Sequence, residues 1–227
     1  AGWYGADRDT LVDITITGVP GVDIPELVKY AAAKNVKIML WLNWEAVKKQ
    51  MDKAFPLYES WGVAGVKIDY MDRDDAEMVK FYHDVVALAA QHKLLVDFHG
   101  AYKPDGMRRT WPNLITREGV LGLEYVKWSE MTTPEHDVTI PYTRMLVGPM
   151  DFTPGAFNNA TQKGFKPVDV NPMSMGTRCH QLAMFVVYES PLQVLADAPV
   201  NASKAAGMDF ISMVPTTWDA TKFVQGE

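Results

Sequence analysis

The feature that most constrains the fold of this chain is the alternation of short apolar runs with segments of helical periodicity. Three apolar runs, at residues 36–42, 64–70 and 93–98, start 28 and 29 residues apart. Nearly continuous apolar runs of this length are typical of strands in a parallel sheet that is covered on both faces. Each interval corresponds to about one strand–helix unit. The pattern therefore predicts an α/β fold.

The segments between these runs show the spacing of amphipathic helices. Asp23 and Glu26 form a capping pattern just before a stripe of apolar residues. Residues 47–58 and 75–92 carry apolar side chains at the same three- and four-residue spacing. Because Pro56 lies inside the first of these two segments, we expect it to kink or split that helix.

The number and the ends of the strands indicate which α/β architecture to expect. Weaker apolar segments at residues 113–116, 144–147 and 192–196 are candidates for three more strands. A nucleotide-binding doubly wound sheet would have a Gly-rich fingerprint after a strand, and no expected strand is followed by one. Polar residues lie at the ends of these strands instead, as they do at the active-site face of a (β/α)8 barrel. We therefore expect a (β/α)8 barrel in preference to a doubly wound sheet. Since such a barrel needs about 250 residues and the chain has 227, we expect it to be incomplete, with about strands 3–8 present.

Charge and composition exclude several classes of protein. The 22 Lys and Arg residues are outnumbered by 28 Asp and Glu residues, so nucleic-acid binding through phosphate contacts is not expected. No apolar run reaches the roughly 18 residues of a membrane-spanning helix, and we expect no membrane insertion. The single cysteine, Cys179, excludes an internal disulfide and a Cys-rich zinc site, and we expect it to be buried.

The first residues lack the pattern of a secretory signal, and we expect both ends to be cut points in a longer chain.

Asp69 is the strongest single candidate for a catalytic group. It closes the second apolar run, and Lys67 lies two residues earlier, on the same face of a strand. A lysine beside a carboxyl group favours its ionised form. The alternative is that Asp69 caps the following helix or pairs with Arg73.

Other polar and aromatic residues follow the expected strands and are candidates for the same site. They include Trp44 after the first strand, and Asp97 and His99 at the end of the third. Glu118 and Glu124 lie in a loop with two glycines, and carboxylates on such a loop could bind Ca²⁺. The alternative is a solvated loop in which Arg117 pairs with one of the two acids.

Five motifs, in this order along nearly the whole chain, resemble glycoside hydrolase family 97. They are GVKIDYMD at residues 65–72, VDFHG at 96–100, TREG at 116–119 followed by Glu124, GPMDFTPG at 148–155 and VPTTWD at 214–219. Members of this family have an N-terminal β-sandwich, a catalytic (β/α)8 barrel and a small C-terminal β domain. The resemblance implies that residues 1–227 form part of the catalytic barrel and that both flanking domains lie outside this chain.

The resemblance also implies roles for individual residues. Asp69 matches the nucleophile of the retaining branch of the family, and Glu124 matches its general acid/base. Glu118 and Glu124 match ligands of a Ca²⁺ ion near the scissile bond. Gly100 stands where the inverting branch has its catalytic base.

The resulting hypothesis is a retaining α-galactosidase that works by double displacement, with an α-galactoside or oligosaccharide as substrate. Substrate-binding candidates are Lys67, Asp97, His99, Trp44 and Trp3. One alternative is an inverting α-glucosidase of the same family, and another is a truncated, inactive carbohydrate-binding remnant. A truncated barrel could also associate with itself. The resemblance further implies a periplasmic or secreted protein.

Overall fold

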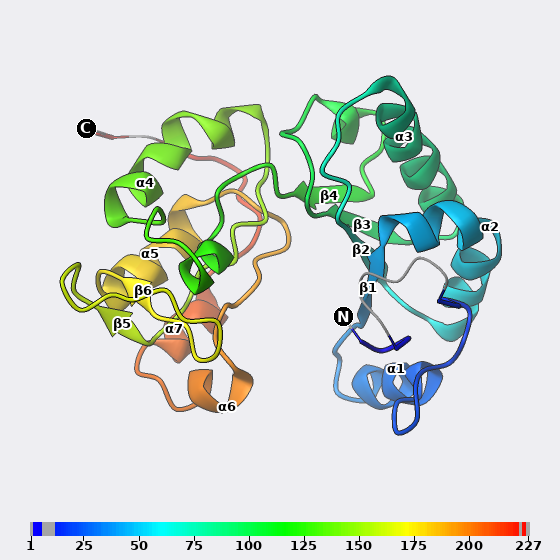
Figure 1. The fold of residues 1–227 in the computed structure, drawn as a ribbon, viewed down its shortest axis with the longest axis horizontal. Helices are drawn as coiled ribbons and strands as arrows, with labels where there is room; N and C mark the ends of the chain where they lie inside the picture. The colour runs from blue at the N-terminus through cyan, green and yellow to red at the C-terminus, as the bar shows by residue number, and fades with distance from the viewer. Residues whose placement is uncertain (1, 6–11, 223, 226–227) are drawn as a thin grey trace. The chain divides into compact units, whose positions relative to one another are not determined.

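The computed structural model of the protein describes residues 2–5, 12–222 and 224–225. The chain divides into two compact units, Ala1–Gly119 and Val120–Glu227 (Figure 1). None of the helices in this described part combines the length and the apolar character that a membrane crossing requires.

A parallel four-stranded sheet forms the centre of the first unit, and its strands lie in sequence order, β1-β2-β3-β4. The strands are β1 (Met39–Asn43), β2 (Gly65–Asp69), β3 (Leu95–Phe98) and β4 (Leu114–Arg117). In the register of the sheet, Leu42 pairs with Ile68 and Ile68 pairs with Phe98. All three side chains are fully buried. The four strands expected in this half of the chain are thereby confirmed, as is the α/β class.

Three helices belong to the first unit: α1 (Ile24–Ala32), α2 (Trp44–Trp61) and α3 (Ala76–Gln91). Each begins where a side chain satisfies free backbone N–H groups. Asp23 accepts a hydrogen bond from the N–H of Glu26 at 3.0 Å. Asp75 accepts from the N–H groups of Glu77 and Met78 at 3.1 and 3.2 Å. Such caps contribute about 1 kcal/mol each.

Of the two effects expected of Pro56, a kink or a split, the split does not occur, because α2 continues through this residue as one helix. Proline removes one helical hydrogen bond and crowds the preceding turn. Phe55 and Tyr58, on either side of it, are fully buried in the core. Tertiary packing of this kind outweighs the local preference of a single residue.

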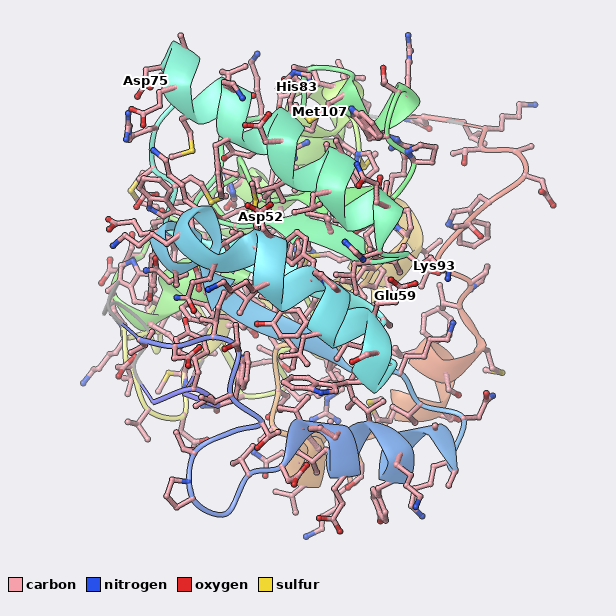
Figure 2. All side chains as sticks on the ribbon, turned by 90° about the vertical axis from the view of Figure 1, so that its right-hand side faces the viewer. Asp52, Glu59, Asp75, His83, Lys93 and Met107 are labelled. Atoms are coloured by element: carbon pink, nitrogen blue, oxygen red, sulfur yellow. The ribbon has the colours of Figure 1, made fainter. Side chains whose placement is uncertain are left out.

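Helices α2 and α3 cover one face of the sheet (Figure 2). Where the two helices end, Glu59 contacts Nζ of Lys93 at 2.8 Å and Nδ1 of His92 at 3.0 Å. Figure 2 shows Glu59 and Lys93 next to each other at this point. Every second side chain of a strand points to the same face of the sheet, and the apolar ones point toward these helices.

The opposite face of the sheet carries one tryptophan and three polar residues in a single row. Trp41 pairs with Lys67, Lys67 with Asp97, and Asp97 with Thr116. Because side chains alternate along a strand, these residues point away from the helices that bury Leu42 and Ile68. The sheet therefore has one apolar face and one face equipped for polar contacts.

Short elements joined by long loops make up the second unit (Figure 1). Its α-helices are α4 (Pro134–Thr139), α5 (Arg178–Val187), α6 (Pro199–Ala202) and α7 (Met208–Met213). Its 3-10 helices are η2 (Leu123–Lys127), η3 (Ile140–Tyr142) and η4 (Arg144–Val147), while η1 (Met107–Arg109) belongs to the first unit. β5 (Asn159–Ala160) pairs with β6 (Ser174–Met175). A separate core includes Phe152, Met184 and Tyr188.

Two of the expected strands are wrong. Residues 144–147 form the 3-10 helix η4, in which Leu146 is 76% exposed and therefore has no covering layer. Arg144 donates hydrogen bonds to the carbonyl groups of Gly148 and Pro149 at 2.9 and 3.0 Å, which favours a turn. Residues 192–196 form no strand either. Cys179, expected to be buried, is exposed on α5.

Candidate active site

Asp69 lies at the carboxyl end of β2, on the polar face of the sheet, and is 8% exposed. Its Oδ2 atom accepts a hydrogen bond from Nε1 of Trp41 at 3.0 Å. Its Oδ1 atom accepts from the N–H of Tyr70 at 2.7 Å and lies 3.4 Å from Nδ1 of His99. Both oxygens therefore have fixed partners, which hold the carboxylate in one orientation.

These partners keep Asp69 ionised. Burial by itself would raise the pKa of the carboxyl group. The hydrogen bond and charge of His99, with the donors of Trp41 and Tyr70, outweigh burial and lower the pKa below its ordinary value. A buried carboxylate with a lowered pKa is suited to act as a nucleophile or to stabilise a positive charge.

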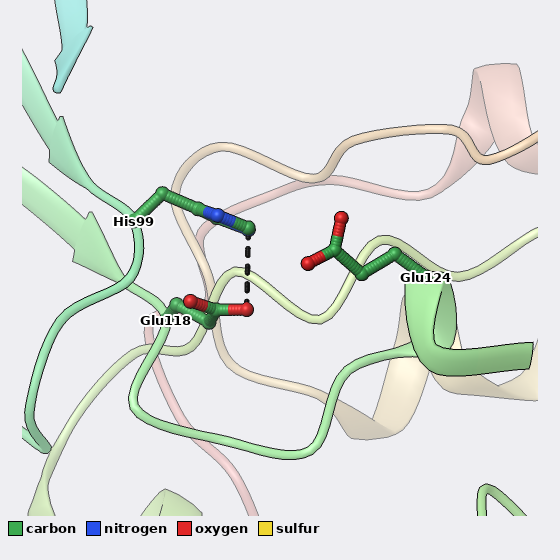
Figure 3. A group of neighbouring side chains, drawn as sticks. All are labelled: His99, Glu118 and Glu124. Atoms are coloured by element: carbon green, nitrogen blue, oxygen red, sulfur yellow. Dashed lines mark ion pairs between the residues drawn. The ribbon is translucent and has the colours of Figure 1, made fainter. Parts of the chain in front are cut away.

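His99 connects Asp69 to a second carboxylate, Glu118. Its Nε2 atom lies 3.4 Å from Oε1 of Glu118, and the dashed line in Figure 3 marks this ion pair. Burial by itself would lower the pKa of His99, and Lys67 acts in the same direction. Hydrogen bonding to Asp69 and the charges of both acids outweigh these effects and raise the pKa to about 9. An imidazolium thus lies between two carboxylates at neutral pH.

Glu118 follows β4 directly and is 7% exposed. Its Oε2 atom accepts a hydrogen bond from the N–H of Gly100 at 2.6 Å. Gly100 has φ +56°, and a Cβ atom at this position would meet the backbone N of Tyr70 at 2.9 Å. The backbone thus leaves no room for a side chain at position 100.

Lys67 does not play the role expected from its spacing. Its Nζ atom forms an ion pair with Oδ2 of Asp97 at 3.4 Å, and Asp97 is fully buried. The reason is register, because Lys67 and Asp97 are direct partners on neighbouring strands. The expectation that Lys67 holds Asp69 ionised is therefore corrected: His99 is the cation with that effect.

The alternative explanations for Asp69 fail, and Glu118 is too buried to lie in a solvated loop. Arg73 pairs with Asp75 and Glu77, and the cap of α3 is Asp75 and not Asp69. Arg117 is buried, and its guanidinium carbon lies 4.8 Å from the ring centroid of Tyr82 on the helix side of the sheet. Asp69 therefore has neither of the structural roles that its alternatives required.

The aromatic candidates differ in how they are placed. Trp3 is 9% exposed and donates a hydrogen bond from Nε1 to the carbonyl of Trp41 at 2.9 Å. Its ring packs edge-on against Tyr4, so a predicted stacking role for Trp3 on a sugar gains no support. Trp44, half-buried at the start of α2, packs edge-on against Phe81 and has Arg73 5.8 Å from its ring centroid.

Glu124 belongs to the second unit and lies in η2. It forms part of the wall of a cleft of about 860 Å³ in that unit. Glu124 follows Glu118 by six residues in the chain.

Sequence reasoning missed two contacts of this site. It did not identify Trp41 as a donor to Asp69, and it did not identify His99 as the bridge between Asp69 and Glu118. The alternation of side chains along β1 and β2 held a signal for the first contact, since Trp41 shares a face with Lys67 and Asp69. For the second, the signal was a histidine at the end of the neighbouring strand.

Comparison with known proteins gives several matches. A family model described as glycoside hydrolase 97 matches residues 1–120. The chain is 44% identical over 212 residues to a retaining alpha-galactosidase of Bacteroides thetaiotaomicron. It is 37% identical over 206 residues to a probable retaining alpha-galactosidase of Streptomyces bingchenggensis. These matches cover 92% and 89% of this chain.

Solved structures match as well. A variant of a glycoside hydrolase family 97 enzyme from Pseudoalteromonas sp. strain K8, in complex with panose, has a TM-score of 0.82 at 34% identity. The enzyme in complex with acarbose has a TM-score of 0.81 at 35% identity. Each match covers 96% of this chain and 36% of the other. The chain thus spans about a third of the length of its relatives, since it covers 32% and 30% of the two galactosidases.

Proposed function

The chain belongs to glycoside hydrolase family 97, and from this membership we propose that it hydrolyses terminal α-galactosides with retention of configuration. Two relatives at 44% and 37% identity carry the names retaining and probable retaining alpha-galactosidase. The observation that carries the proposal is the site of Asp69, a buried carboxylate with fixed partners and a lowered pKa. Retaining hydrolysis requires such an ionised carboxylate as the nucleophile.

In the proposed reaction, an oxygen of Asp69 attacks the anomeric carbon of the galactosyl residue. The bond from this carbon to the leaving oxygen breaks as Glu124 donates a proton to that oxygen. A water molecule then loses a proton to Glu124 and attacks the same carbon, which releases Asp69. Two inversions give net retention.

Inverting hydrolysis by a base at position 100 is disfavoured by the backbone. Gly100 has no side chain that could activate water, and its φ of +56° and its contact with Tyr70 oppose any replacement. An inverting α-glucosidase is therefore the weaker of the two enzymatic alternatives.

We further propose that the sheet is part of a (β/α)8 barrel and that residues 1–227 supply part of a catalytic domain. The four strands follow one another in sequence order, and α2 and α3 cover the same face of the sheet. A doubly wound sheet would reverse its strand order and carry helices on both faces. In a barrel all helices lie outside, and side chains at the strand ends converge on the active site.

The polar face of the sheet supports a role in sugar binding. Lys67, Asp97 and His99 offer charged donors and acceptors near Asp69, and sugar hydroxyl groups can form hydrogen bonds of both kinds. We propose that these residues orient the galactosyl ring and that Trp44 borders the opening.

We propose that Glu118 and Glu124 hold a Ca²⁺ ion. Their carboxylate oxygens are the donors that Ca²⁺ prefers, whereas the imidazole of His99 suits transition metals better. A bound Ca²⁺ would supply positive charge near the leaving group. Calorimetric titration should show Ca²⁺ binding that Glu118→Gln weakens, and equal affinity in the variant would refute this assignment.

Product stereochemistry tests the proposed reaction. Proton NMR of freshly formed galactose from 4-nitrophenyl α-galactoside should show the α-anomer first. The Bacteroides relative provides a parallel measurement. A β-anomer as first product would establish inversion, and absence of hydrolysis by this chain beside activity of the relative would favour a non-catalytic, sugar-binding role.

A further inference from the structure

The two oxygens of the Asp69 carboxylate differ in the number of donors that contact them. Oδ1 accepts a hydrogen bond from the N–H of Tyr70 at 2.7 Å and lies 3.4 Å from Nδ1 of His99. Oδ2 accepts from Nε1 of Trp41 at 3.0 Å, and this is its one donor among the residues that the structure describes. A carboxylate oxygen can accept about two hydrogen bonds. Oδ1 therefore has both acceptor positions occupied, whereas Oδ2 keeps one open.

The indole of Trp41 is held in place by aromatic neighbours. Its ring is stacked with that of Tyr4, with an angle of 12° between the planes and 6.3 Å between the centroids. The ring of Tyr70 packs edge-on against it, with the centroids 5.6 Å apart. The backbone of Trp41 is fixed as well, because its carbonyl accepts a hydrogen bond from Nε1 of Trp3 at 2.9 Å. The N–H group of the indole is thus preorganised toward Oδ2 of Asp69.

The open acceptor position identifies the atom that can attack a substrate. A nucleophilic oxygen needs a lone pair that no donor occupies, and the side chain of Asp69 is 12% exposed, so that part of it is open to a substrate. We propose that Oδ2 is the attacking oxygen and that Trp41 is a catalytic donor, which stabilises the charge on Oδ2 when the galactosyl ester breaks down. The inference rests on the proposed function, because it takes Asp69 as the nucleophile of a double displacement.

The hydrogen bond from Trp41 changes in strength during the first half of the reaction. A lone pair of Oδ2 forms the bond to the anomeric carbon, the bond from this carbon to the leaving oxygen breaks, and that oxygen takes a proton from Glu124. Oδ2 is then an ester oxygen, which accepts hydrogen bonds poorly because its lone pairs are shared with the carbonyl group. Oδ1 becomes the carbonyl oxygen and keeps its donors. Since hydrogen bonds to a charged oxygen are the stronger ones, Trp41 stabilises the free carboxylate more than the ester.

This difference assists the second half of the reaction. Water gives a proton to Glu124 and attacks the anomeric carbon, and the bond from this carbon to Oδ2 breaks with its electron pair returning to Oδ2. Trp41 stabilises the negative charge that grows on this oxygen in the transition state. In the first half the same hydrogen bond weakens as attack proceeds, so it gives no acceleration there. Trp41 therefore acts on the breakdown of the ester and not on its formation.

Steady-state and burst kinetics with 4-nitrophenyl α-galactoside test this role. Trp41→Phe removes the N–H group and keeps an aromatic ring. It should lower kcat by about tenfold, the size of one hydrogen bond to a charged group. KM should fall with kcat because the ester accumulates, so kcat/KM should not decrease, and a burst of 4-nitrophenol equal to the enzyme concentration should appear. Trp61→Phe, the same change at a half-buried tryptophan at the end of α2, should leave kcat and KM unchanged. A lower kcat/KM without a burst in Trp41→Phe would reveal a merely structural role and overturn the inference.

A measurement on the unaltered protein identifies the attacking oxygen without any substitution. 5-Fluoro-α-galactosyl fluoride should lose fluoride and leave a slowly hydrolysed galactosyl ester on Asp69, which mass spectrometry locates. On labelling, the NMR resonance of the Trp41 indole N–H should move upfield, and further than that of the Tyr70 amide N–H. The reverse order would make Oδ1 the nucleophile and overturn the inference while double displacement stands. Absence of an ester on Asp69, or a β-anomer as first product, would overturn the proposed function and the inference with it.

Discussion

The Nδ1 atom of His99 lies 3.4 Å from the Oδ1 atom of Asp69. This contact joins the ends of two neighbouring parallel strands, β2 and β3. Since burial opposes ionisation of Asp69, the imidazolium is the group that keeps the carboxylate charged. The same ring also contacts Glu118, so a single side chain couples the proposed nucleophile to a proposed metal ligand.

Replacing His99 should move the acid limb of the pH profile. The lowered pKa of Asp69 means that activity requiring its ionised form is present above that pKa and is lost as the pH falls through it. In His99→Asn the carboxyl group loses its main cationic partner, so its pKa rises and the acid limb of kcat/KM shifts to higher pH. His83→Asn changes an exposed histidine on α3 and should leave the limb in place. An unshifted limb in His99→Asn would show that another group keeps Asp69 ionised.

Much of the first unit could be predicted from the sequence because local signals and tertiary structure agree there. The apolar runs became β1 to β4, and the acids Asp23 and Asp75 cap the helices they precede. In the second unit the apolar run at residues 144–147 gives no strand, because no layer covers Leu146. An apolar run shows that a segment can be buried, and it does not show which neighbour buries it.

The sequence allowed the residues of the candidate site to be proposed, but it did not allow a prediction of which residues contact one another. Asp69 and Asp97 lie near the ends of apolar runs, and His99 and Glu118 follow such runs. The structure places all four at or just after the carboxyl ends of parallel strands. Periodicity also placed Lys67 on the face of Asp69, yet Lys67 pairs with Asp97. Cross-strand register decides that pairing, and register depends on contacts between segments that a single sequence does not display.

Removing Lys67 should destabilise the protein, because it leaves the fully buried Asp97 without its lysine partner. We expect Lys67→Met to lower the free energy of unfolding by about 2 kcal/mol. This is less than the 3–5 kcal/mol of a fully buried pair, since the lysine is partly exposed. The double variant Lys67→Met/Asp97→Asn should recover part of the loss. Urea denaturation measures both.

An exposed pair provides the control for this prediction. Lys80 and Asp84 form an ion pair one helical turn apart on α3, with the lysine side chain 73% exposed. Lys80→Met should change the free energy of unfolding by less than about 1 kcal/mol. If Lys67→Met cost no more than Lys80→Met, the pair on the sheet would be of no energetic importance.

Gly100→Ala should be more damaging than the same change at Gly106. Both glycines have positive φ, +56° and +92°, so both substitutions strain the backbone. Only at position 100 does the new Cβ atom meet backbone, since nothing lies within 4 Å of it at position 106. We expect Gly100→Ala to lower the free energy of unfolding by about 1–3 kcal/mol more than Gly106→Ala does, as measured by thermal or urea denaturation. Equal losses would mean that the loop adjusts, and that position 100 can accept a side chain.

Asp69→Gly should abolish turnover of 4-nitrophenyl α-galactoside and should be rescued by azide. Loss of a nucleophile typically costs a factor of about 10⁴ or more. In the space left by the carboxylate, azide can attack the anomeric carbon from the same side, with Glu124 still protonating the leaving oxygen. The product is then a β-galactosyl azide, which NMR identifies. Asp72→Gly, an aspartate-to-glycine change three residues away at a backbone φ of +44°, should retain activity and form no azide product. An α-galactosyl azide from Asp69→Gly would place the nucleophile elsewhere.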